Sequence, residues 1–252
     1  NVTNLDGTTT GAISFTDADG LTITGLASTN TNITINASGL LTVTGLVDAG
    51  TGDVSLTAAG VTQSGAGAIT SDDLLLAGTG TFNLGGANNV ATFAAGTTGA
   101  VTFSDTNGFS LSGGIATGNS AVSLTAASGT LTIDQTVNAG TSTVTLTAND
   151  LDISAAVTGN GGIAIAPFTA ATTVGVGAGA GTLSIDTTEL GLLTSTGIVT
   201  IGSASAGNLT TSALNLSAAA FGLALQSGAA IDVGGVTMAA NRPFSTNSTG
   251  GT

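Results

Sequence analysis

The chain contains no cysteine, histidine, lysine, tryptophan or tyrosine. Without cysteine, the chain forms no disulfide framework, performs no thiol catalysis and offers no cysteine ligand to a metal. Without histidine or lysine, the usual bases of nucleophilic triads are missing. The absence of tryptophan and tyrosine removes the aromatic platforms on which sugars commonly stack. These gaps argue against most enzyme classes, and we expect no catalytic residue and no cofactor.

Positive charge is almost absent, because Arg242 is the only basic residue against 14 acidic ones, and the net charge is −13. Nucleic-acid binding requires basic side chains that neutralise phosphates, so nucleic acid is excluded as a partner. The same deficit argues against docking on anionic lipid. Trypsin-like proteases would find almost nothing to cut, which suits an extracellular protein.

Long hydrophobic runs are also missing. The most apolar window, 163–181, is interrupted by Pro167, Thr169, Thr172 and Thr173, which argues against a transmembrane helix and against membrane insertion. Residues 1–10 show no basic segment or apolar core of a signal peptide, and we expect the chain to be a processed product or part of something longer.

Short alternating runs separated by glycine, asparagine and aspartate make up most of the chain. The stretch 141–165 contains three of them, at 143–147, 151–153 and 163–165, with every second residue apolar. This alternation is typical of strands with one buried face. We expect Val144, Leu146, Ile153, Ile163 and Ile165 to be stacked core positions.

The runs recur with a period of about 20 residues. Displacements of 20 to 22 residues separate several apolar pairs: Leu21 and Leu41, Leu56 and Leu76, Phe82 and Phe103, Leu124 and Leu146, Ile133 and Ile153, and Ile165 and Ile185. Two or three short strands per repeat predict an all-β fold, a right-handed parallel β-helix (β-solenoid) of roughly 12 rungs. At about 4.8 Å per rung the rod would be on the order of 58 Å long.

We expect one solenoid domain over 1–244 and a polar C-terminal tail over 245–252. One helical turn is expected at 217–221, where alanine is concentrated. The interior should hold the aliphatic side chains together with seven aromatic ones: Phe15, Phe82, Phe93, Phe103, Phe109, Phe168 and Phe221.

The period, the runs at 21–24 and 129–133, and Asn-Ala-Gly corners such as 138–140 resemble filamentous-haemagglutinin-type adhesins, bacterial surface proteins of the two-partner-secretion kind. The resemblance covers nearly the whole chain but includes none of that family's secretion-domain motifs. It implies an extracellular fibrous shaft at the cell surface, with attachment and biofilm formation as its role.

Three carboxylate pairs are the candidates for acid–base chemistry: Asp72 with Asp73, Asp150 with Asp152, and Asp186 with Glu189. Asp150 and Asp152 should point to the same side of a strand. Polysaccharide-cleaving β-helices combine such pairs with basic groups, which this chain lacks. We therefore expect no enzyme.

Asp17 and Asp19 are the only metal candidates. The run Asp17-Ala18-Asp19-Gly20 resembles the start of a calcium loop, but the third aspartate and the distal glutamate are missing. An Asx-type corner before the strand at Leu21 is the favoured interpretation.

Threonine pairs such as Thr22/Thr24, Thr42/Thr44 and Thr143/Thr145/Thr147 are a possible outward array. Stacked Thr-x-Thr pairs on a flat solenoid face are typical of an ice-binding surface. However, Ser55, Asp152 and Ala164 interrupt the pattern at comparable positions, which favours ordinary outward strand residues.

The leading hypothesis is an extracellular structural protein, a fibre subunit or adhesin shaft that associates end to end through unpaired terminal strands. A cell-surface or glycan target is compatible with this role. The alternative is a ligand-binding solenoid, which would bind ice through threonine ladders or glycans on a lateral face.

Overall fold

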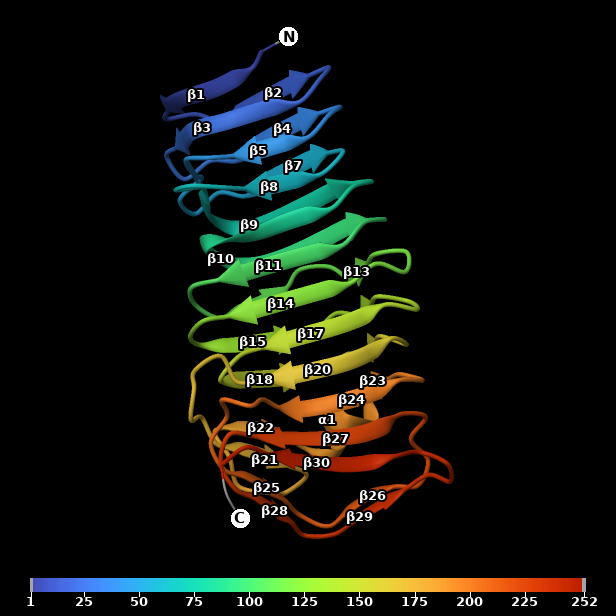
Figure 1. The fold of residues 1–252 in the computed structure, drawn as a ribbon. Helices are drawn as coiled ribbons and strands as arrows, with labels where there is room; N and C mark the ends of the chain where they lie inside the picture. The colour runs from blue at the N-terminus through green and yellow to red at the C-terminus, as the bar shows by residue number, and fades with distance from the viewer. Residues whose placement is uncertain (1, 251–252) are drawn as a thin grey trace.

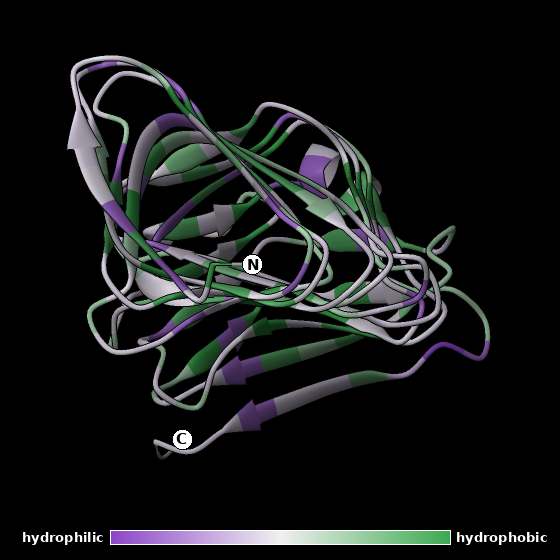
Figure 2. Ribbon diagram, turned by 90° about the horizontal axis from the view of Figure 1, so that it is seen from above, coloured by the Kyte–Doolittle hydropathy of each residue, from purple (hydrophilic) through white to green (hydrophobic). Residues whose placement is uncertain are grey.

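The computed structural model describes residues 2–250, and it is an all-β, right-handed solenoid of about 12 turns. Parallel strands from successive turns stack one below another along the rod (Figure 1). Viewed along the axis, the turns superimpose as a coil around a common interior (Figure 2). The predicted fold class is therefore confirmed. Residues 1, 251 and 252 lie outside the described part of the chain.

The first column of strands is continuous from one end of the rod to the other. Each member is hydrogen-bonded in parallel to the next. Its strands are β1 (Asn4–Thr9), β3 (Leu21–Ser28), β5 (Leu41–Val43), β8 (Val61–Gln63), β10 (Phe82–Thr97), β11 (Val101–Asp105), β14 (Val122–Ala126), β17 (Thr143–Thr147), β20 (Gly162–Ala166), β24 (Ile198–Gly202), β27 (Gly222–Ser227) and β30 (Phe244–Ser248).

A second column completes the turns of the N-terminal two thirds. It contains β2 (Ile13–Asp17), β4 (Ile33–Ala37), β7 (Val54–Ala58), β9 (Ala68–Gly78), part of β10, β12 (Phe109–Leu111), β15 (Thr130–Ile133) and β18 (Asp150–Ile153). The short strand β6 (Leu46–Asp48) connects β3 with β9. A third column runs through β13 (Ile115–Ala116), β16 (Val137–Asn138), β19 (Val157–Thr158) and β23 (Leu193–Thr194).

The C-terminal third is less regular. A four-stranded sheet has the order β22 (Leu183–Ile185), β21 (Val174–Val176), β25 (Leu209–Thr211) and β28 (Ile231–Val233). A two-stranded sheet pairs β26 (Leu214–Leu216) with β29 (Val236–Met238). The helix α1 (Thr187–Gly191) lies between β22 and β23 in the chain.

The core is a stack of alternate apolar residues. Val144, Leu146, Ile153, Ile163 and Ile165, the predicted stacking positions, are all at most 2% exposed. Because each turn is thin, a side chain packs mainly on its equivalents one turn above and one turn below, which makes stability a sum over neighbouring turns.

Aromatic side chains occupy one level of this core. The rings of Phe93 and Phe103 are stacked with centroids 4.2 Å apart, and Phe109 meets both edge-on. Phe82 and Phe221 are also buried and Phe15 is partly buried, but Phe168 is 48% exposed at the corner after β20, so its predicted burial is wrong.

The predicted register is confirmed for four of the six pairs: Leu21 with Leu41, Leu56 with Leu76, Leu124 with Leu146, and Ile133 with Ile153. Two pairs are wrong. Phe82 lies opposite Val101, because that turn is shorter by two residues. Ile165 lies opposite Ile201 rather than Ile185, because an insertion with its own strands and helix intervenes.

Two further expectations are corrected. The segment 217–221 forms turns and bends, while the helix lies at Thr187–Gly191, where Asp186 and Glu189 form a capping box that alanine content does not reveal. The polar tail expected from residue 245 is not separate, because β30 pairs with β27 as far as Ser248. Alternation at 244–248 places a strand there despite its polar composition.

Candidate functional site

Asp17, the first calcium candidate, ends strand β2 and is almost fully buried. Its carboxylate accepts hydrogen bonds from the backbone N–H groups of Val2 (2.9 Å) and Asp19 (3.0 Å). These bonds, with that from Val2 first, lower the pKa of Asp17. Asp17 thus forms an Asx-type corner and Asp19 is exposed beside it. Within residues 2–250 no three acidic, histidine or cysteine side chains gather as a metal site, and calcium binding stays a prediction.

Two of the three carboxylate pairs come together. Asp150, Asp152, Asp186 and Glu189 line one open groove of about 640 Å³ between β18 and α1. Asp150 and Asp152 point to the same, exposed side of β18, as predicted. The third pair is separate from this groove, and Asp73 accepts hydrogen bonds from the hydroxyl groups of Thr92 and Ser112.

Glu189 in this groove joins the helix to the sheet. Its Oε2 accepts the N–H of Asp186 (2.7 Å) and its Oε1 accepts the N–H of Ile153 (2.9 Å). Burial, which outweighs these hydrogen bonds, raises the pKa of Glu189, and the charges of Asp186 and Asp152 raise it further. No basic side chain lines the groove. Both oxygens of Glu189 therefore hold backbone groups in place at the edge of β18.

A second candidate is an uncharged lateral surface on the first column, which we call the hydroxyl face. Outward residues of β3, β5, β8, β11, β14 and β17 follow one another in register along two rows. The rows are interrupted by Asn83 and Gly85 of β10. The first row is Thr22, Thr42, Thr62, Thr102, Ser123 and Thr145, and the second is Thr24, Thr44, Ser64, Ser104, Thr125 and Thr147.

The hydroxyl face is more regular than the sequence indicated. Ser55 and Asp152, which appeared to interrupt the pattern, belong to β7 and β18 of the second column. Ala164 does follow Thr145 in register and ends the array. Strand register was the missing signal, because equal spacing along the chain does not tell which column a threonine occupies.

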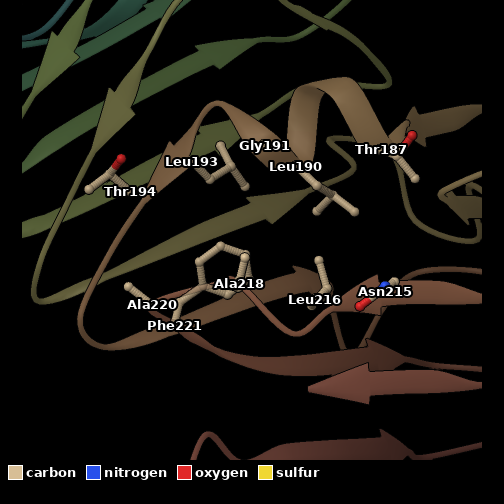
Figure 3. Close-up of a pocket in the computed structure, with 11 residues that line it drawn as sticks. Thr187, Leu190, Gly191, Leu193, Thr194, Asn215, Leu216, Ala218, Ala220 and Phe221 are labelled. Atoms are coloured by element: carbon tan, nitrogen blue, oxygen red, sulfur yellow. The ribbon is translucent and has the colours of Figure 1, made fainter. Parts of the chain in front are cut away.

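A third candidate is a pocket of about 360 Å³ in the C-terminal third (Figure 3). Leu190 of α1 and Leu193 of β23 point into it from one side, and Leu216 of β26 and Phe221 lie on the opposite side. Thr187, Thr194 and Asn215 are exposed and lie among its lining residues. No charged residue contributes to the lining. The pocket can therefore accept a mainly apolar, neutral group, and no sequence pattern indicated it.

Comparison of the chain with protein-family models, with curated proteins and with solved structures finds no match. What stands is the coarser statement that the chain is a β-solenoid repeat protein. Within residues 2–250, no helix has the length and apolarity required to span a membrane.

Proposed function

We propose that the protein is an extracellular structural element, the shaft of an adhesin of the filamentous-haemagglutinin kind or a fibre subunit, and that it acts without catalysis. The observation that carries this proposal is the unbroken first column, which stacks from β1 to β30 over the full length of the rod. A stack in which each turn supports its neighbours gives reach and stiffness. The scarcity of basic residues gives resistance to trypsin-like proteases.

End-to-end association is part of the proposal. Among the described residues, β1 pairs with β3 alone and β30 pairs with β27 alone, so each terminal strand has an edge available for another strand. Apolar inner residues at both ends are only partly buried: Leu5, Ile13 and Phe15 at one end, and Ile231, Val233, Val236 and Met238 at the other. Stacking a second copy on such an end would bury them.

Negative-stain microscopy tests this association. The wild-type protein should form filaments of uniform width that are much longer than one rod. Val236→Asp places a charge inside the last turn and should abolish filaments, whereas Thr237→Asp adds the same charge to the exposed side of the same strand and should leave them intact. Short monodisperse rods from the wild-type protein would show that the copies do not associate.

A second candidate function is binding of an ordered ligand, ice or a glycan, on the hydroxyl face. The observation that favours it is the register of the two hydroxyl rows, which repeat at about 4.8 Å along the rod. Thermal hysteresis at micromolar protein tests the ice interpretation. Thr102→Lys lies on the hydroxyl face and should remove the hysteresis, whereas Thr34→Lys on β4 should not. Absence of hysteresis in the wild-type protein would remove ice as a ligand, and a glycan array would then test the other ligand class.

A further inference from the structure

The three columns contain unequal numbers of strands in the C-terminal third. Between β17 and β24 the first column has one strand, β20. Between β18 and β25 the chain places two strands, β22 and β21. Between β19 and β26 the third column has only β23. An additional strand on one side occupies about 4.8 Å of rod length that the third column does not match.

The third column is open at this level as a result. Among the described strands, β23 pairs only with β19, and β26 pairs only with β29. In Figure 1 the strands β26 and β29 lie well away from β23, and α1 lies between them. The helix fills part of the opening, and the pocket of about 360 Å³ is the part that stays unfilled.

The strand edge of β23 faces this opening. The carbonyl groups of Leu192 and Thr194 accept hydrogen bonds from Val157 and Gly159 of the neighbouring turn, each at 3.0 Å. Peptide groups of successive residues in a strand point to opposite edges. The N–H and C=O groups of Leu193 are therefore directed away from β19, toward the opening.

The strand edge of β26 faces the opening from the other side. Leu214 donates its N–H to Gly235 (2.9 Å), and Leu216 accepts the N–H of Ala239 (3.0 Å), so both are engaged with β29 and the turn after it. By the same alternation, the N–H and C=O groups of Asn215 point toward β23. Two strand edges thus border one opening, each with peptide groups that a parallel strand between them can engage.

The side chains around the opening suit the inner face of such a strand. Leu190 and Leu193 on one side and Leu216 and Phe221 on the other present apolar surface, and the small residues 218–220 form a wall. Strands elsewhere in the third column and its continuation, such as Val157–Thr158 and Val236–Met238, alternate inward apolar with outward threonine. The pattern that fits the opening is therefore apolar, polar, apolar.

We propose that this opening is a peptide-binding slot that takes an uncharged, extended segment of about three residues from a partner protein as an additional β-strand between β23 and β26. Backbone hydrogen bonds to Leu193 and Asn215 would hold the segment, and its alternate apolar side chains would contact Leu190, Leu216 and Phe221. This role does not depend on end-to-end association or on the hydroxyl face.

The direct test uses a fluorescent peptide with the core acetyl-Gly-Leu-Thr-Leu-Gly-amide, whose binding to the full chain is measured by anisotropy. Saturable binding is expected, with no binding by the charged analogue acetyl-Gly-Glu-Thr-Glu-Gly-amide. Ala218→Phe fills the slot from its exposed wall and should weaken binding at least about tenfold, which corresponds to about 1.4 kcal/mol. Ala66→Phe, in an exposed turn far along the chain, is the matched control and should bind like the wild type.

Amide hydrogen exchange supplies a second readout. Peptide binding should slow exchange at Leu193 and Asn215 and leave Leu214, already bonded to Gly235, unchanged. The proposal is overturned if the peptide does not bind saturably, if Ala218→Phe binds it as well as the wild type while circular dichroism shows both folded, or if neither amide gains protection. Binding of benzyl alcohol at Phe221 without peptide binding would instead indicate a small-molecule pocket.

Discussion

Asp105 is the most deeply buried carboxyl group of the described chain, at 1% exposure. Its two oxygens accept the N–H groups of Val90 (2.8 Å) and Asn107 (2.7 Å). Burial raises the pKa of Asp105 above its ordinary value of 3.8, against the effect of these two hydrogen bonds. The carboxyl group thus orders a corner of the coil at some cost when it is ionised.

This arrangement predicts a specific dependence of stability on pH. Because the pKa of Asp105 is higher in the folded protein, its contribution to stability is fully present below the unfolded pKa and declines as the pH rises through the folded pKa. Asp105→Asn removes this titration and leaves one N–H without an oxygen partner, which costs about 1–3 kcal/mol. The wild-type Tm minus the Asp105→Asn Tm should therefore shrink as the pH rises from about 4 to 7. A difference that stays constant or grows would contradict the assigned pKa direction.

Sequence reading had no access to these interior polar groups. Asn88 is fully buried and donates to the carbonyl groups of Leu84 and Ser104, while it accepts the N–H of Ile69. In the sequence, Asn88 and Asp105 look like the many exposed asparagine and aspartate corners. Only the path of the chain between columns places them inside, where three-dimensional neighbours supply their partners.

Among the elements, corners are constrained by the close approach of successive turns. Gly78, at the end of β9, has φ +140°, and a Cβ there would lie 1.8 Å from the carbonyl oxygen of Ala58 one turn away. Gly96 lies one turn further along, where a Cβ would meet nothing within 4 Å. The two glycines thus differ in whether the stack tolerates a side chain.

Substitution of these two glycines tests the stacking distance. Gly78→Ala should lower the free energy of unfolding by about 1–3 kcal/mol or more, because backbone must move to relieve the contact and φ is unfavourable. Gly96→Ala should be neutral or stabilising by up to about 1 kcal/mol. Urea denaturation measures both, and equal effects at the two positions would show that the turns are not packed as closely as described.

Most strands could be predicted from alternation, because a half-buried strand requires an apolar residue at every second position. Register was correct where turns kept 20 to 22 residues and failed where length changed. Ile163 pairs with Val199, which lies 36 residues further along the chain, and no periodicity spans such an insertion. The helix at Thr187–Gly191 was missed because it depends on the capping box of Asp186 and Glu189 rather than on an apolar stripe.

On the scale of the whole molecule, the candidate surfaces depend on how columns align. Thr22 and Thr42 were recognised as a pair in the sequence, but their continuation through Thr62, Thr102 and Thr145 required the strand register. The peptide-binding slot was not predictable, because it results from one column having a strand that another lacks. Composition, by contrast, correctly indicated a coil of thin turns, since small and β-branched residues suit closely stacked strands.

The central claim is that copies continue the first column from one molecule to the next. Asn4 of β1 and Ser245 of β30 occupy equivalent outward positions in that column, through Thr22 at one end and Ala224 at the other. Head-to-tail stacking would bring Ser245 of one copy beside Asn4 of the next, at a strand spacing of about 4.8 Å that permits a disulfide. Within one copy these two positions lie at opposite ends of the rod.

Oxidation of the double variant Asn4→Cys/Ser245→Cys, in a chain without other cysteines, is the most direct test of this claim. Non-reducing electrophoresis should show a ladder of trimers and longer multimers that reducing agent collapses to the monomer, while each single variant yields dimers at most. A double variant that stays monomeric, or stops at dimers as the single variants do, would contradict head-to-tail stacking of the solenoid.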